Sequence, residues 1–152
     1  MIDNLIAYNV APECGILLAG MPGHPIEDVV LSNVQIHYAG GGTDEQAARD
    51  VPELEKAYPD PSLFGILPSW GIFARHVKNL QVRGAEFRTL NPDARPAIVL
   101  DDVQDARFAN TIVSTDPAAP VWSFKNIQRL HVRDVTRLSD GDFPDTINRV
   151  LR

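Results

Sequence analysis

Short stretches of alternating apolar and polar residues return along this chain at a nearly constant interval. The five stretches start at Ile2, Ile26, Val77, Val103 and Ile127. The interval is about 25 residues, except between the second and third starts, where it is about twice as long. Alternation with a period of two is typical of β-strands and not of helices. A repeat of this length predicts an architecture in which each repeat stacks on the next.

A second apolar stretch precedes most of these repeats. These earlier stretches are Gly15–Leu18, Gly71–Ala74, Ala97–Leu100 and Val121–Phe124. Two or three short strands per period, with no helix between them, predict an all-β fold, namely a parallel β-helix of about four to five coils. Leucine-rich repeats have a similar period and are the alternative. They require a ladder of leucines, whereas the inward positions here mix Ile, Val, Leu and Phe, so we favour the β-helix.

Most repeats also carry an Asn or Asp at a shared position. Both residue types tolerate a left-handed backbone and bond to neighbouring amides, so they suit a turn between two faces of a stack. The residues at this position are Asn4, Asp28, Asn79 and Asp105, with Arg129 in the fifth repeat. We therefore expect these residues to form one row along the stack.

Composition and charge exclude several classes of function. With 152 residues, the chain is expected to form a single domain over residues 1–152. A net charge of −6 and no basic patch argue against a nucleic-acid partner. No apolar run approaches the roughly 18 residues of a membrane span, and the N-terminus lacks the pattern of a signal peptide. Cys14 is the only cysteine, which excludes an intrachain disulfide and leaves the compartment undetermined.

One segment, residues 40–70, interrupts the repeat. Residues 44–57 are helix-like, Thr43 is suited to cap them, and Pro52 interrupts them. The rest is an extended, proline-rich loop with enough apolar residues to dock on the body of the fold. At the other end, we expect residues 138–152 to form a cap, with a short helix from Asp145 to Arg152.

Several segments together resemble the C-terminal part of bacterial polygalacturonase-like proteins, in glycoside hydrolase family 28 of the pectin lyase-like superfamily. The resemblance covers roughly Ile2 to Arg137 and implies a right-handed parallel β-helix with an ancestry in pectin breakdown. The segments that carry it are Leu18–Val29, Gly40–Thr43, Val51–Pro59, Phe64–Pro68, Arg75–Val77 and Pro92–Val103.

The motifs that carry catalysis in this family do not occur in the matched region. The family inverts glycosidic bonds with Asp carboxylates in Asn-Thr-Asp and Asp-Asp motifs, accompanied by Gly-His-Gly and Arg-Ile-Lys motifs. Here Asp101-Asp102 lies in the context of a late coil, and Gly23-His24-Pro25 is not Gly-His-Gly. No catalytic residue of the family is therefore transferred, and the chain resembles a truncated or standalone portion of such an enzyme.

Four residues remain as candidates for catalysis: Cys14, His24, Arg75 and His76. A Cys–His pair is one route to an activated nucleophile, and a loop histidine can act as a general base. The alternatives are a buried, inert Cys14, a surface turn at His24, and ion pairing of Arg75 with a neighbouring coil. No spacing typical of a zinc, EF-hand or phosphate-loop site is present, so we predict no metal and no cofactor.

A second set of residues is predicted to contact substrate. An Arg at residue 75 offers two parallel donors to a uronate carboxylate, and the acidic and aromatic residues of the insertion can meet a sugar. The set is Glu53, Glu55, Tyr58, Trp70 and Arg75. For the two glutamates, the alternative is a solvated helical face.

The first coil of such a stack would expose its apolar cross-section, because no coil precedes it. Exposed ends and edges promote pairing with other chains. We therefore expect self-association as a closed dimer or trimer. Three functions stay open. The first is a pectin-type glycoside-hydrolase-related protein that acts on, or retains affinity for, acidic polysaccharide. The second is a small standalone, esterase-like hydrolase with a site at a subunit interface, and the third is a non-catalytic carbohydrate-binding or structural remnant.

Overall fold

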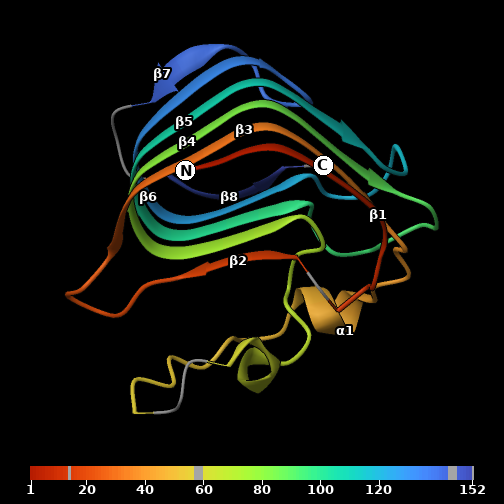
Figure 1. Cartoon of the computed structure of the whole chain (residues 1–152), viewed down its shortest axis with the longest axis horizontal. Coiled ribbons are helices and arrows are strands. Elements are labelled where there is room, and N and C mark those ends of the chain that lie inside the picture. Colours follow the sequence, from red (N-terminus) through yellow and green to blue (C-terminus); the bar gives the residue numbers. More distant parts are fainter. Residues whose placement is uncertain (14, 57–59, 144–146, 152) are drawn as a thin grey trace.

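The computed structural model describes residues 1–13, 15–56, 60–143 and 147–151. They form an all-β fold with almost no helix and one mainly parallel sheet (Figure 1), which confirms the predicted class. The strands are β1 (Ile2–Val10), β2 (Ile16–Ala19), β3 (Ile26–Tyr38), β4 (Ile72–Thr89), β5 (Ile98–Ser114), β6 (Trp122–Val135), β7 (Gly141–Phe143) and β8 (Ile147–Leu151). The helical elements are α1 (Asp44–Ala47) and a 3-10 turn, η1 (Pro61–Phe64).

Strands β1, β3, β4, β5 and β6 pair in this order, each parallel to the next, and β2 pairs with the first part of β4. Val77 lies opposite Val103, and Val103 lies opposite Ile127. The repeats predicted at these three positions are therefore in register. Figure 1 shows that the strands are not straight but arch around a common interior.

The arches bend at residues with a positive φ. These residues form three rows across neighbouring strands, and most are Asn or Asp, which adopt the left-handed conformation at low cost. The first row is His76, Asp102 and Asn126. The second is Asp28, Asn79, Asp105 and Arg129, and the third is Asn4, Asn33, Gly84, Asn110 and Asp134.

Two predictions about the first repeat are wrong. Ile2 pairs with Leu31 and not with Ile26, and Asn4 consequently belongs to the third row instead of the row of Asp28. Because Asn and Asp recur in all three rows, an Asn alone does not say which bend it occupies. The inward-facing apolar residues do not decide the register either. Leu5 is as compatible with Val34, its observed partner, as with the position that the repeat predicted.

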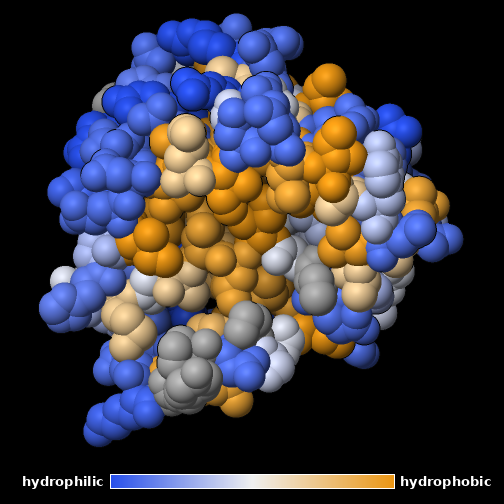
Figure 2. Space-filling model, in the orientation of Figure 1, coloured by the Kyte–Doolittle hydropathy of each residue, from blue (hydrophilic) through white to orange (hydrophobic). Residues whose placement is uncertain are grey.

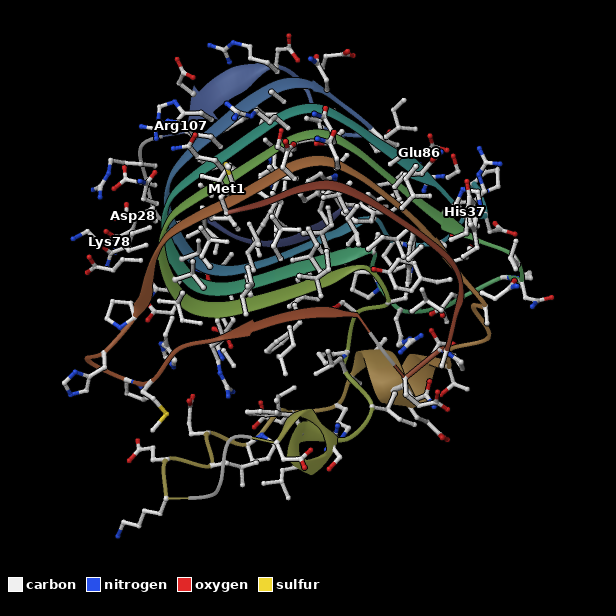
Figure 3. The ribbon with its side chains drawn as sticks, viewed as in Figure 1. Met1, Asp28, His37, Lys78, Glu86 and Arg107 are labelled. Carbon is white, nitrogen blue, oxygen red and sulfur yellow. The ribbon has the colours of Figure 1, made fainter. Side chains whose placement is uncertain are left out.

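The core lies inside the arches and is built from rows of inward-facing aliphatic and aromatic side chains. Trp122 packs edge-on against Phe108 at a ring separation of 5.1 Å. Figure 3 shows labelled polar residues on the outside: Asp28 and Lys78 lie on one side of the arches, and Glu86 and His37 lie on the opposite side. Burial of the apolar rows is the main source of stability in such a fold.

The insertion packs on the outer surface of the sheet, as its apolar content predicted. Val51 and Leu67 form a second apolar cluster with Phe73 of β4, and Leu17 and Val99 flank them. This contact places the insertion across β2, β4 and β5.

The helix within the insertion is shorter than predicted. Thr43 caps α1 through a reciprocal pair of hydrogen bonds with Gln46, as expected, but the helix ends at Ala47. After the helix, Arg49 donates to the carbonyls of Phe64 and Ile66. These tertiary bonds hold the segment in an irregular path that a helix could not follow.

A fully buried ion pair joins three loops. Arg95 donates to both carboxylate oxygens of Asp93, at 3.0 and 2.7 Å, and both side chains have no exposed surface. Arg95 also donates to the carbonyls of Pro12 and Leu67, and the amide of Gly42 donates to Asp93. A side chain at Gly42 would collide with this pair, so glycine is required there for close approach.

The C-terminal segment is a pair of strands, and the predicted helix over 145–152 is wrong for its described part. Strands β7 and β8 pair antiparallel with β6 and occupy the edge that β6 would otherwise leave open. Phe143 and Leu151 pack against the core. Edge pairing and this apolar contact outweigh local helix propensity. The described part of the segment covers the edge of β6.

We predict that Asp93→Ala lowers the free energy of unfolding by about 3 kcal/mol, because it leaves the buried guanidinium of Arg95 without its counter-ion. Urea denaturation measures this change. Glu27→Ala is the control, since Glu27 forms an exposed pair with Lys78 at 3.7 Å, and such pairs contribute about 1 kcal/mol or less. Equal losses in the two variants would contradict the role given to the buried pair.

Candidate functional site

Three of the predicted site residues meet at the first bend of β4. The insertion brings Glu53 against Arg75 and His76, which are adjacent on the strand. Docking through the second apolar cluster is what positions Glu53, because the insertion has no strand pairing of its own among the described residues. Cys14 and Tyr58 lie outside the described residues.

Arg75 is buried, with 4% of its side chain exposed. Its guanidinium donates to the carbonyl of Val51 at 2.6 Å and to that of Pro52 at 3.0 Å, and lies 3.4 Å from Glu53. Within the described residues its Nε has no hydrogen-bond partner. Arg75 therefore anchors the insertion to the sheet, and its ion pair is with Glu53 of the insertion and not with a neighbouring coil.

His76 lies between two carboxylates. Its Nδ1 is 2.6 Å from Asp102 Oδ2, and its Nε2 is 3.2 Å from Glu53 Oε1. The side chain is 14% exposed, whereas Glu53 and Asp102 are 40% and 36% exposed. The imidazole is thus held from both sides, by the insertion and by β5.

This arrangement favours the charged form of His76. Burial acts to lower the pKa of the imidazole, but the hydrogen bonds and charges of Asp102 and Glu53 outweigh burial, and the pKa is raised above its ordinary value of 6.5. A protonated imidazole donates one hydrogen bond from each of its two nitrogens. It is therefore suited to tie two acidic groups together.

Asp102 and Asn126 complete the cluster and were not among the predicted site residues. Asn126 Nδ2 donates to Asp102 Oδ1 at 2.6 Å, and the backbone amide of Asn126 donates to Asn148 Oδ1 at 2.7 Å. Both Asp102 and Asn126 belong to the bend row of His76. The signal was present in the sequence, since Asp102 follows His76, and Asn126 follows Asp102, at the interval of the repeat.

The remaining predicted residues lie elsewhere. Trp70 is 1% exposed and packs edge-on against Tyr38 in the core. His24 is exposed in a tight turn, where its backbone pairs with that of Met21. Glu55 is exposed on the insertion. The structure thus brings together Glu53, Arg75 and His76, and leaves these three apart from them.

Two hollows flank the cluster. The first lies between the insertion and the outer face of β4, β5 and β6, and its wall includes Arg49, Asp101, Ser123 and Lys125. The second lies between the turn at residues 21–25 and the bend of β4, where His76, Lys78, Asp102 and Gln104 line it. Arg75 borders the first hollow and His76 borders the second, so the cluster separates them.

The chemistry of the cluster is that of carboxylates and an imidazole. Both ring nitrogens of His76 contact carboxylates, and neither contacts a hydroxyl among the described residues. No group of three or more His, Cys, Asp or Glu within the described residues is arranged to hold a metal ion. In the same part of the chain, none of the helices is long and apolar enough for a membrane span.

We predict that the protein loses stability as pH rises through the raised pKa of His76. A group whose pKa is higher in the folded state contributes fully below its unfolded pKa of about 6.5, and this contribution disappears above the folded-state pKa. Urea denaturation over a pH series measures the loss. His76→Asn should abolish it while keeping the bend, because Asn126 occupies the same row.

Titration of His76 by NMR tests whether the two carboxylates are the cause of its raised pKa. Glu53→Gln and Asp102→Asn should each lower the pKa of His76, because each removes a charged hydrogen-bond acceptor. Glu55→Gln, the same change two residues away on an exposed side chain, should leave it unchanged. A pKa of His76 at or below 6.5 in the unmodified protein would contradict the cluster described above.

No family model, curated protein or solved structure matches the chain. The resemblance to family 28 glycoside hydrolases therefore stays a prediction from the sequence.

Proposed function

We propose that the stacked sheet is a short right-handed parallel β-helix and that the chain is a portion of a pectin-type, family 28-related protein. The resemblance of the sequence segments named above is the basis for this assignment. It is supported by the in-register stacking of the repeats along β4, β5 and β6 and by the three rows of bends. Solenoids of this type stack repeats that contact only their neighbours.

One observation carries the functional proposal: segments that resemble the family converge on one site. Glu53 comes from Val51–Pro59, His76 from Arg75–Val77, and Asp102 from Pro92–Val103. The turn that walls the second hollow belongs to Leu18–Val29. Because these segments are far apart in the sequence, their meeting around two hollows favours a shared function in binding.

The ligand class that fits the first hollow is an acidic polysaccharide. Lys125 is 70% exposed and gives one hydrogen bond to Asp101 at 3.2 Å. An ammonium group has three donors, so it can also bind the carboxylate of a uronic acid. Ser123 and Asp101 offer a hydroxyl and a carboxylate to sugar hydroxyls.

Polar side chains of successive strands follow one another along the first hollow. Lys125 of β6, Asp101 of β5 and Arg75 of β4 are in register on successive strands, which lie about 4.8 Å apart in a sheet. A polymer laid across the strands would follow this row and meet Asp101 and Lys125 in turn. The role assigned to this surface is binding, without a reaction.

We predict that the protein binds oligogalacturonate more tightly than a neutral oligosaccharide of equal length, and that Lys125→Glu weakens this binding by about tenfold. The reversal removes a charge-assisted hydrogen bond and adds a repulsive charge. Isothermal titration calorimetry at low ionic strength measures both affinities.

Arg88→Glu is the matched control. It also reverses an exposed cation that pairs with a carboxylate, Glu86, at 2.9 Å, but it lies away from both hollows. Its affinity for oligogalacturonate should equal that of the unmodified protein. Absence of binding at millimolar ligand, or equal losses in the two variants, would overturn the proposed function.

A further inference from the structure

Two cations at the first bend of β4 face one carboxylate of the insertion. Glu53 lies 3.4 Å from the guanidinium of Arg75 and 3.2 Å from Nε2 of His76. The sequence predicts that Arg75 binds the carboxylate of a uronic acid, and in the structure the carboxylate beside it is that of Glu53. The insertion thus supplies, from within the chain, the chemical group that was expected of a ligand.

Glu53 makes the longest contact of each cation. Arg75 donates to two backbone carbonyls of the insertion at 2.6 and 3.0 Å, and His76 lies 2.6 Å from Asp102. An N–H···O hydrogen bond is usually about 2.7–3.2 Å long, so the two contacts of Glu53 lie at or beyond the long end of this range. Glu53 is therefore the member of the cluster whose departure costs the least.

Glu53 is also the accessible member of the cluster. Its side chain is 40% exposed, whereas Arg75 and His76 are nearly buried beside it. Figure 2 shows polar groups along the border of this face of the molecule, and Figure 1 places the insertion at that border. If Glu53 leaves, the carbonyl bonds still hold Arg75 and Asp102 still holds His76. A carboxylate from solution can therefore take the place of Glu53 between two fixed cations.

The charges of the cluster require an anion at this place. Arg75 and protonated His76 are two cations, and Asp102 and Glu53 are two carboxylates. Without Glu53, one positive charge is left uncompensated in a largely buried environment, where an unpaired charge is costly. In addition, Nε of Arg75 has no hydrogen-bond partner among the described residues. The place of Glu53 therefore suits a second carboxylate.

We propose that Glu53 is an exchangeable internal carboxylate, and that the place between Arg75 and His76 is a binding site for a ligand carboxylate. The ligand class rests on the proposed function, since Arg75 borders the first hollow and is in register with Asp101 and Lys125. Arg75 and Lys125 are two strand spacings apart, about 10 Å, so one oligogalacturonate can place a carboxylate on each. Glu53 is then an autoinhibitory group that the bound polymer displaces.

Tethering makes this exchange selective for a polymer. A group on the same chain competes at an effective concentration on the order of millimolar, so a free monosaccharide with one carboxylate displaces Glu53 only well above that concentration. An oligogalacturonate held at Lys125 presents its further carboxylates at a comparable effective concentration. The site is therefore closed to free galacturonate and open to the polymer.

Glu53→Ala tests the exchange, because it removes the competitor. It should tighten the binding of oligogalacturonate by about tenfold, measured by isothermal titration calorimetry. Glu53→Gln keeps the shape of the side chain without its charge, and should tighten binding in the same direction. Glu55→Ala is the matched control, an exposed glutamate two residues away, and should leave the affinity unchanged. Unchanged or weaker binding in both Glu53 variants would overturn the proposal.

NMR titration of His76 reads the same site without the polymer. In Glu53→Ala, the pKa of His76 should fall, because one of the two carboxylates that raise it is lost. Millimolar galacturonate should restore this pKa, whereas galactose, which has no carboxylate, should not. In the unmodified protein, the same concentration of galacturonate should have no effect.

The two readouts separate this inference from the proposed function. Binding of oligogalacturonate without restoration of the His76 pKa by galacturonate would overturn the exchange and leave the proposed function intact. Restoration by galacturonate without binding of oligogalacturonate would support the carboxylate site and overturn the proposed function.

Discussion

The structure depends on one constraint: each long strand must bend sharply while its inward side chains stay in register with those of the layers on both sides. The bends are made by residues with positive φ, and three rows of them run along the stack. Without these bends, β4 or β5 would run straight for 18 or 17 residues and could not enclose a core. The register then follows from the apolar rows, since a slip of one residue would turn each strand's core side chains outward.

The same bends create the candidate site. A bend row presents side chains at the outer corner of the stack, where successive layers lie close enough for hydrogen bonds between neighbours. In two of the rows these bonds are structural, such as that from Asn79 to Asp28 at 2.6 Å. In the first row, His76 and Asp102 are bonded in the same way, and His76 also contacts Glu53 of the insertion. An element needed for folding and an inserted loop thus share one cluster of titratable groups.

Much of the fold could be predicted from the sequence, because the repeats at Val77, Val103 and Ile127 carry both the apolar alternation and the turn position in one register. The register of Ile2 could not, since Asn4 fits more than one bend row. Local pattern also fails for the C-terminus, where pairing with β6 decides the conformation of residues 147–151. Local propensity does not decide the conformation where a segment can pair with the open edge of a strand far away in the sequence.

The site shows the same division. Glu53, Arg75 and His76 were chosen for their chemistry, and their meeting depends on tertiary docking that no local pattern encodes. Trp70 illustrates the reverse error: an aromatic residue at the end of a loop suggests ligand stacking, but packing against Tyr38 places it in the core. Asp102 could have been predicted from the repeat spacing alone, because it occupies the same position as His76 one period later in the sequence.

The antiparallel cover formed by β7 and β8 gives the stack a terminus that no further layer can follow. Lengthening such a molecule would therefore succeed by duplicating an internal module, for example the residues from Val77 to Asp102, and fail by appending modules after Val135. A designer who wants longer scaffolds of this kind can treat the two C-terminal strands, β7 and β8, as a reusable stop element and vary the number of modules before it.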